Sequence, residues 1–341
     1  MNPKQIEEFF HLTPVQKYLL AASERASDGS SWLTQFGCVL NGQIDVAAFK
    51  RAWQKVSDRQ FGLRTTFVSG DLKEPVQVIN RNVLVDFEEQ DWRGVPETEQ
   101  GTRFSEFLQS DRQEKFLLKN PQLWRLTLLR MSENRYYLIW TYHYLLLDRT
   151  SLTIILSEVL AYYEAIHQAQ NLILPHPPSA RKFVDWLKKQ NSGQAEEFWQ
   201  KQLQGFIPEA SLPLEKGEIL LSLPDEIFAS LEDLAEKTQL TLETIFYGAW
   251  ALLLSRHSGQ QDVAFGIRVP SRPKELAGAE RLIGQFANTL PLRVQINPQA
   301  TVSEWLTQIQ RQRDEVRTYE YSSLAQIQKW SGLEPETILI G

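Results

Sequence analysis

The segment from Trp140 to Ser151 holds the residues best suited to acid–base chemistry. It contains His143, Tyr144 and Asp148, and a strand-like pattern gives way there to a helix-like one. Side chains at such a junction are often reactive, because the flanking elements position them. An imidazole can take up or release a proton near neutral pH. A phenol, with a pKa of about 10, is a poor base there, but it can donate a hydrogen bond to an amine or an oxyanion.

The alternation of side chains along a strand limits what these residues can do together. Thr141 and His143 share one face of the expected strand, whereas Tyr144 belongs to the other face, so His143 and Tyr144 face one cavity only if the strand bends. A lone histidine on a strand is more often a packed, hydrogen-bonded residue than a catalyst, and the residues alone leave both roles open. Asp148 stands beside several leucines and, if buried, needs a cationic partner.

Strands and helices are expected on both sides of this segment. Thr13 and Gln16 have the spacing of a capping box at the start of a helix, and Asp45 is suited to cap a second helix. The hairpin that leads into the segment turns at 132–134, and a helix with one apolar face follows the segment. The expected elements of this half, apart from the two capped helices, are strands at 32–40, 64–68, 126–131 and 135–143 and a helix at about 151–168.

A proline-rich stretch divides the chain. Residues 174–180 hold three prolines in seven positions, which favours an extended connector. We therefore expect an N-terminal lobe at 1–173, a linker at 174–182 and a C-terminal lobe at 183–341. Both halves mix strands and helices, so the fold class is α/β or α+β in two layered lobes.

The second half contains one helix of unusual composition. Residues 245–254 are almost entirely apolar, with Thr241 as the cap and Gly259 as the stop, and they predict a core helix buried on all sides. The other expected elements of this half are helical regions at 183–203, 225–237 and 302–319 and strands at 219–223, 263–269 and 289–294.

Composition excludes several classes of protein. The 341 residues carry a net charge of −6, which argues against nucleic acid as the main partner. The single cysteine, Cys38, excludes an intramolecular disulfide and a zinc site built on cysteines. The first residues lack the apolar core of a signal peptide, and the longest apolar stretch is too short to span a bilayer, so we expect a cytoplasmic protein. No phosphate-binding glycine loop, metal-ligand cluster or Ser-His-Asp triad is legible, so no bound cofactor is expected.

Five motifs in order resemble those of condensation domains from nonribosomal peptide synthetases. The central motif, His143 to Arg149, resembles the family's His-His-x-x-x-Asp-Gly signature. The others are Leu12-Thr13-Pro14-Val15-Gln16, Leu63-Arg64-Thr65-Thr66-Phe67, the stretch 247–273 with its Ser271-Arg272-Pro273, and Ile283-Gly284-Gln285-Phe286-Ala287-Asn288-Thr289-Leu290-Pro291.

This resemblance implies a fold and an activity. The fold would be two lobes like chloramphenicol acetyltransferase, arranged as a V with a tunnel between them. The activity would be amide bond formation between an acyl or aminoacyl thioester and an amine, both presented on phosphopantetheine arms by carrier proteins. No cofactor would be resident in the chain, and the partners would be carrier proteins and other synthetase modules.

The resemblance also assigns roles to residues. The catalytic segment would comprise His143, Tyr144 and Asp148, with Asp148 in a structural ion pair. Arg272 is the expected partner of Asp148, with Arg64 and Arg293 as alternatives. Arg149, Ser151 and Asn288 would border the tunnel and the substrate.

The chain departs from the family pattern at important positions. Tyr144 replaces the second histidine of the motif and Arg149 replaces its glycine. Arg149 could block the tunnel, or it could pair locally with Asp148. The connection at 214–219 is shorter than usual, and the second lobe would lack its final portion, so the resemblance is to a degenerate and C-terminally short member.

Three functions stay open on these grounds. The chain could be an active condensation enzyme in which positioning supplies most of the rate. It could be a non-catalytic module that binds a carrier protein or recruits a partner. It could also be a fragment of a split synthetase. A general acyltransferase that uses coenzyme A is disfavoured, because that reaction also needs a histidine at position 144.

Overall fold

The computed structural model describes residues 5–25, 32–70, 72–207 and 222–333. Backbone contacts divide the chain into two compact units. The first unit comprises Met1–Gln190 and Arg272–Ala287, and the second comprises Asn191–Ser271 and Asn288–Gly341. Each unit contains strands and helices, as the α/β interpretation of the sequence requires.

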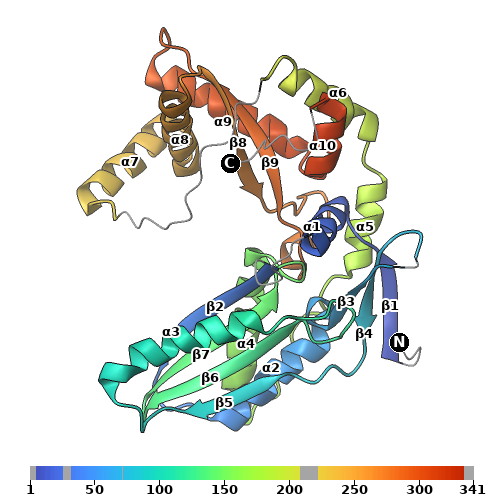
Figure 1. Cartoon of the computed structure of the whole chain (residues 1–341), viewed down its shortest axis with the longest axis vertical. Coiled ribbons are helices and arrows are strands. Elements are labelled where there is room, and N and C mark those ends of the chain that lie inside the picture. Colours follow the sequence, from blue (N-terminus) through green and yellow to red (C-terminus); the bar gives the residue numbers. More distant parts are fainter. Residues whose placement is uncertain (1–4, 26–31, 71, 208–221, 334–341) are drawn as a thin grey trace. The chain divides into compact units, whose positions relative to one another are not determined.

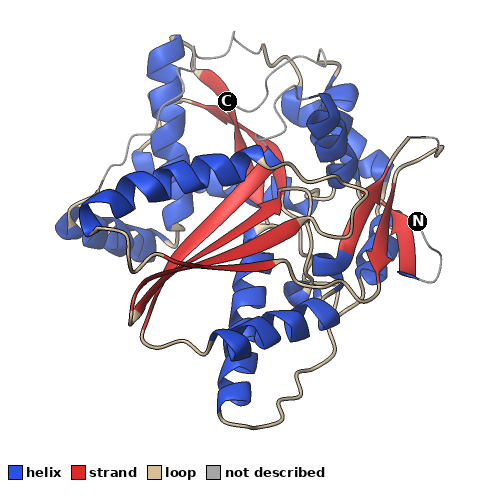
Figure 2. Cartoon of the chain, turned by 60° about the horizontal axis from the view of Figure 1, so that its bottom comes forward, coloured by secondary structure: helices blue, strands red, loops and turns tan. Residues whose placement is uncertain are grey.

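The larger sheet of the first unit is covered by helices on both faces (Figures 1 and 2). The strand order is β2-β7-β6-β5, and all neighbours are antiparallel except the parallel pair β5–β6. One face packs against α2 and α4 through a core that includes Trp53, Trp124 and Trp140. The other face packs against α3 over Leu129 and Ile139. These elements are β2 (Leu33–Asn41), α2 (Val46–Arg59), β5 (Phe87–Asp91), α3 (Glu97–Gln113), β6 (Trp124–Ser132), β7 (Arg135–His143) and α4 (Arg149–His167).

A second, three-stranded sheet lies in the same unit. Its order is β1-β4-β3, and both pairs are antiparallel. The predicted capping box is confirmed at the start of the neighbouring helix, because the amide of Gln16 donates to Thr13 Oγ1 at 3.1 Å and that of Thr13 donates to Gln16 Oε1 at 3.0 Å. These elements are β1 (Ile6–His11), α1 (Pro14–Arg25), a 3-10 turn (Phe61–Arg64), β3 (Thr65–Val68) and β4 (Val76–Asn80).

The first unit extends past the proline-rich stretch and also takes residues from the second half of the chain. Helix α5 (Ala180–Lys188) packs Phe183 against Leu282 and Phe286, which belong to the returning segment Arg272–Ala287. The expected boundary at 174–182 therefore lies inside the first unit rather than at its end. Its prolines lie in a connection that is neither helix nor strand, and the apolar face of the following helix packs back onto the first unit.

The second unit is built on two antiparallel strands, β8 and β9. Its core joins Phe265, Leu292 and Trp305 with residues of α6 and α10. The strand expected at 219–223 falls mostly on residues outside the described ones. The elements of this unit are α6 (Ser192–Leu203), α7 (Asp225–Thr238), α8 (Leu242–Ser258), β8 (Asp262–Val269), β9 (Asn288–Gln295), α9 (Val302–Thr318) and α10 (Leu324–Ser331). A 3-10 turn (Ala279–Arg281) between β8 and β9 in the sequence belongs to the first unit.

Helix α8 corrects one prediction. Its cap at Thr241 and its stop at Gly259, which has a φ of 76°, are confirmed. However, Phe246, Trp250 and Leu253 are 48, 41 and 58% exposed among the described parts of the chain, so the prediction of burial on all sides is wrong there. An apolar composition cannot say how many faces are covered, and the elements that contact this helix, β8, α7 and α9, leave these three side chains exposed.

Candidate active site

Asp148 is the centre of a buried hydrogen-bond network in the first unit. It is 1% exposed and caps the N-terminus of α4. Its Oδ1 accepts hydrogen bonds from the amide and hydroxyl of Ser151, at 2.9 and 2.8 Å. An aspartate is favoured at this position because its carboxylate binds the free N–H groups of the first helical turn.

Arg272 supplies the cation that this carboxylate needs. Its Nη1 lies 2.7 Å from Asp148 Oδ2, and its Nη2 lies 2.8 Å from Asp148 Oδ1. The same guanidinium packs over the ring of Phe286, with 5.1 Å between Cζ and the ring centroid. A two-pronged contact of this kind suits the planar fork of arginine.

The main chain of the returning segment completes the network. The amides of Phe286 and Ala287 donate to Asp148 Oδ2 at 3.2 and 3.1 Å. Ser151 Oγ accepts from the amide of Gly284 at 3.0 Å, and the Gly284 carbonyl, also 3.0 Å away, is an alternative acceptor for the single hydroxyl proton. Asp148 and Ser151 therefore fasten the returning segment to the start of α4, and six donors surround one carboxylate.

The other arginines named from the sequence have different positions. Arg64 pairs with Glu7 at 2.6 Å, and Arg293 pairs with Asp262 at 2.6 Å in the second unit. Arg149 is exposed at the first position of α4. The donors to Asp148 thus come from Arg272, Ser151 and two backbone amides rather than from Arg149.

His143 ends strand β7 and is 4% exposed. The amide of Leu145 donates to its Nδ1 at 3.2 Å. Burial lowers the pKa of His143 from 6.5 to about 4, because the charged imidazolium loses solvation. The imidazole is therefore neutral at pH 7, and a neutral ring that accepts at Nδ1 carries its proton on Nε2.

Tyr144 begins the turn that follows β7 and is half-buried. Its amide donates to the carbonyl of Trp32 at 2.8 Å, and the two rings lie 6.2 Å apart between centroids. The strand ends at His143, so the alternation of side chains along a strand does not determine on which side the Tyr144 phenol lies relative to the imidazole. Trp32 was not singled out from the sequence, and only its place beside the paired strand end could have suggested it.

Asn288 belongs to the second unit. Its Nδ2 donates to the carbonyls of Glu320 and Ser322 at 3.0 and 2.6 Å, so this amide is occupied in joining β9 to the turn before α10. Among the residues named from the sequence, the structure brings together Asp148, Ser151 and Arg272, while His143 ends the preceding strand and Tyr144 begins the turn between them.

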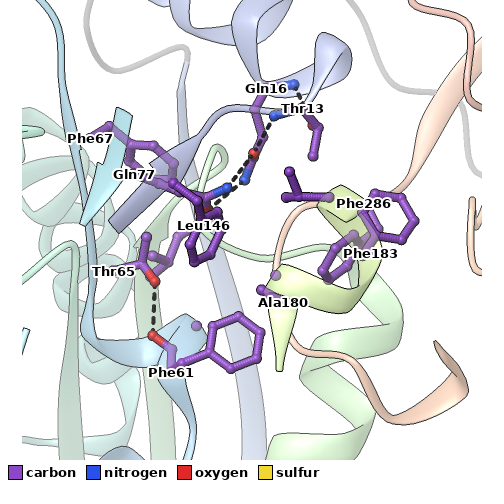
Figure 3. Close-up of a pocket in the computed structure, with 14 residues that line it drawn as sticks. Thr13, Gln16, Phe61, Thr65, Phe67, Gln77, Leu146, Ala180, Phe183 and Phe286 are labelled. Atoms are coloured by element: carbon purple, nitrogen blue, oxygen red, sulfur yellow. Dashed lines mark hydrogen bonds between the residues drawn. The ribbon is translucent and has the colours of Figure 1, made fainter. Parts of the chain in front are cut away.

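A small cavity lies near this network in the first unit (Figure 3). Its walls include the rings of Phe183 and Phe286 and the amides of Gln16 and Gln77, which bond to each other at 3.1 Å. Its volume is about 10 Å³, which is about the space of one water molecule. It is too small to admit a substrate.

Neither metal ligands nor membrane spans are found in the described ranges. No group of three His, Cys, Asp or Glu residues there is arranged to hold a metal ion. No helix among those residues is long and apolar enough to cross a bilayer.

The sequence profile of the condensation domain family matches residues 6–339. The chain belongs to the condensation domain family. The family expected from the five motifs is thereby confirmed.

Curated relatives of this condensation domain are parts of large synthases. Two linear gramicidin synthase subunits of Brevibacillus parabrevis are 36 and 37% identical to it, each over 96% of the chain. The chain spans only 7 and 6% of the lengths of these two proteins.

Solved condensation domains share the fold of this chain. The first condensation domain of the calcium-dependent antibiotic synthetase superposes with a TM-score of 0.82 at 17% identity, over 95% of this chain and 78% of that chain. The starter condensation domain of rhizomide synthetase superposes with a TM-score of 0.84 at 20% identity, over 98% of this chain and 77% of that chain. The mixed α/β fold that the resemblance implied is confirmed.

Proposed function

We propose that this chain is a condensation domain of nonribosomal peptide synthesis whose amide-forming step is weakened at one position. The observation that carries the proposal is that the Asp148 network is complete while position 144 holds a phenol. The scaffold of the motif is retained, and the nitrogen base of its second histidine is replaced.

The reaction joins an amine to an acyl or aminoacyl thioester. The amine nitrogen attacks the thioester carbonyl, the C–N bond forms, and a tetrahedral oxyanion results. The C–S bond then breaks, the thiolate leaves, and the proton lost by the amine restores the thiol directly or through solvent. Holding the two reactants in place supplies much of the rate, and a base that accepts the proton adds about 10²- to 10⁴-fold.

The residues of the turn divide these tasks unequally. Asp148, with Arg272 and Ser151, fixes the turn and the start of α4 but has all its acceptor positions occupied. His143 is buried and already accepts a hydrogen bond at Nδ1, so it is suited to packing rather than to taking a substrate proton. Tyr144 can donate a hydrogen bond to the oxyanion but is a poor base.

The substrates and partners follow from the family. We propose that donor and acceptor arrive as thioesters on the phosphopantetheine arms of carrier proteins, so phosphopantetheine is brought by partners rather than held by this chain. Relatives such as the linear gramicidin synthase subunits support this proposal, because they are much longer proteins that contain a matching domain.

Restoring the family residues tests the proposal. The Tyr144→His, Arg149→Gly double variant should form amide from model carrier-bound substrates about 100-fold faster than the wild type. Arg149→Gly alone should change the rate little, because Arg149 is exposed and does not bond to Asp148. Tyr144→Phe should slow the wild-type reaction if the phenol donates to the oxyanion. A wild type already as fast as the double variant would contradict the proposal.

A non-catalytic carrier-binding module is the second candidate, and the phenol at position 144 favours it as well. Titration of the wild type with a carrier protein, together with a turnover assay, distinguishes the two candidates from each other and from a fragment of a split synthetase. A module that binds shows saturable binding without turnover, the weakened enzyme shows both, and a fragment of a split synthetase shows neither.

A further inference from the structure

Helix α3 covers one face of the larger sheet (Figure 1). A second polar cluster lies on that face, close to the end of β7. It joins Gln35 of β2, Thr141 of β7, Arg125 of β6 and Asp111 of α3. Thr141 is directly paired with Gln35 on one side and with Arg125 on the other, so three strands contribute one polar row.

Asp111 receives a hydrogen bond from every member of this row. Its Oδ2 accepts from Gln35 Nε2 and from Thr141 Oγ1, both at 2.5 Å. Its Oδ1 accepts from Arg125 Nε at 2.6 Å. The carboxylate therefore links three neighbouring strands to one helix.

Stability alone is a weak reason for this arrangement. Asp111 is 8% exposed and lies in the last turn of α3, where a negative charge is unfavourable to the helix dipole. Removing such a charge from water costs several kcal/mol, and a buried ion pair rarely outperforms a well-packed apolar contact. Arg125 offsets part of this cost, since it also donates to the carbonyls of Asp111 and Glu114 and so caps the helix.

The location of the row suggests what it does. Thr141 and His143 are successive residues on the same face of β7, about 7 Å apart along the strand. Thr141 is thus the last residue of β7 on that face before His143, and Asp111 accepts a hydrogen bond from its side chain. The turn with Tyr144 starts one residue later.

We propose that Asp111 is a positioning residue: through Thr141 Oγ1 its carboxylate fixes the end of β7 and thereby the orientation of the His143 imidazole and of the turn that carries Tyr144. The proposal rests on the proposed function only in taking this turn as the site of amide formation.

Substitutions at Thr141 test this link without removing the buried ion pair. Thr141→Val keeps the shape and the Asp111–Arg125 contact but removes the hydroxyl. Thr141→Ser restores a hydroxyl. Thr127→Val is the matched control, because Thr127 is buried on the same face of the sheet two rungs away and is paired with Ile139. If Thr141→Val does not fold, Thr141→Ala removes the same hydroxyl without a second methyl against the carboxylate.

Two readouts are compared in the full chain. The first is the ring signal of His143 in proton–carbon NMR spectra, assigned from a His143→Gln variant. The second is kcat and KM for amide formation from carrier-bound substrates. We expect Thr141→Val to move the His143 signal and to lower kcat about tenfold at an unchanged KM, since small misplacements of a reacting group are costly. Thr141→Ser should restore both values, and Thr127→Val should change neither.

The outcomes separate this proposal from the proposed function. An unmoved His143 signal in Thr141→Val, a failure of Thr141→Ser to restore it, or an equal movement in Thr127→Val would each overturn the positioning role. A wild type without amide formation would contradict the proposed function alone, and the NMR comparison would then decide the positioning role.

Discussion

Arg272 Nη1 lies 2.7 Å from Asp148 Oδ2, although the two residues are 124 positions apart in the chain. Both side chains are almost fully buried, at 4 and 1% exposed. The pair, with Ser151, holds residues of the second half of the sequence in the first unit. The stability of this unit should therefore depend on contacts between residues far apart in the chain.

The first prediction concerns the buried pair. Asp148→Asn should lower the free energy of unfolding of the first unit by about 3–5 kcal/mol, because it leaves the Arg272 guanidinium buried without its counter-charge. Chemical denaturation checks this value. The matched control is Asp262→Asn, which breaks a pair that is 35% exposed on the acidic side and should cost about 1 kcal/mol or less. Equal losses in the two variants would contradict the special role of burial.

The second prediction concerns a close approach of two backbones. A Cβ at Gly62 would lie 2.7 Å from Ile283 Cγ2 and 2.8 Å from the Ile283 carbonyl oxygen. Gly62→Ala should therefore cost about 1–3 kcal/mol, because the returning segment would have to shift. Gly101→Ala in α3 meets no atom within 4 Å and should stabilise the helix by about 0.5–1 kcal/mol. Thermal unfolding of both variants gives the comparison, and a destabilised Gly101→Ala variant would count against it.

The third prediction concerns acid. Burial lowers the pKa of His143 to about 4, so below pH 6.5 the unfolded chain binds a proton that the folded chain does not. The corresponding stability is fully present above pH 6.5 and is lost as the pH falls from 6.5 to about 4, by about 3 kcal/mol in total.

Comparison of variants isolates this contribution from that of the carboxylates. His143→Gln should be less stable than the wild type at neutral pH, and the difference should shrink towards pH 4. His176→Gln, at an exposed position before α5, should follow the wild-type pH profile throughout. Parallel profiles for the wild type and His143→Gln would show that the imidazole does not titrate as described.

The fourth prediction concerns α8. Leu253→Gln should change the free energy of unfolding by about 0.5 kcal/mol or less, because Leu253 is 58% exposed. Leu292→Ala, in the fully buried part of β9, should cost about 2–5 kcal/mol. Denaturation of both variants checks the contrast. A large loss in Leu253→Gln would mean that this face of α8 is covered in solution.

Local features could be predicted from the sequence, because the groups that form them are close together in the chain. The caps at Thr13, Asp45 and Thr241 are examples, since each hydroxyl or carboxylate binds an amide three residues later. The hairpin of β6 and β7 followed from two apolar runs joined by Glu133 and Asn134.

Features that depend on distant packing could not be predicted in this way. The short strands β1, β4 and β5 carry weak patterns and owe their pairing to neighbours far along the chain. Helix α3 is mostly polar: its apolar face consists of Phe104, Phe107 and Leu108, which are only partly buried, and Asp111 is its one buried residue. The exposure of α8 depends on which elements surround it, which its composition does not record.

The candidate site shows the same division. The pairing of Asp148 with Arg272 was expected only from the family resemblance, because three arginines were open choices on the sequence. The backbone donors of Phe286 and Ala287 and the carbonyl of Trp32 were missed, since a main-chain group leaves no trace in residue types.

The return of Arg272–Ala287 to the first unit sets an order of events during synthesis. At about 5–20 residues per second, the ribosome adds Arg272 about 6–25 seconds after Asp148. Until then the carboxylate has only the local Ser151 donors, and water must supply the rest. The N-terminal half therefore cannot finish folding as it emerges, and it must wait for the middle of the second half to be made.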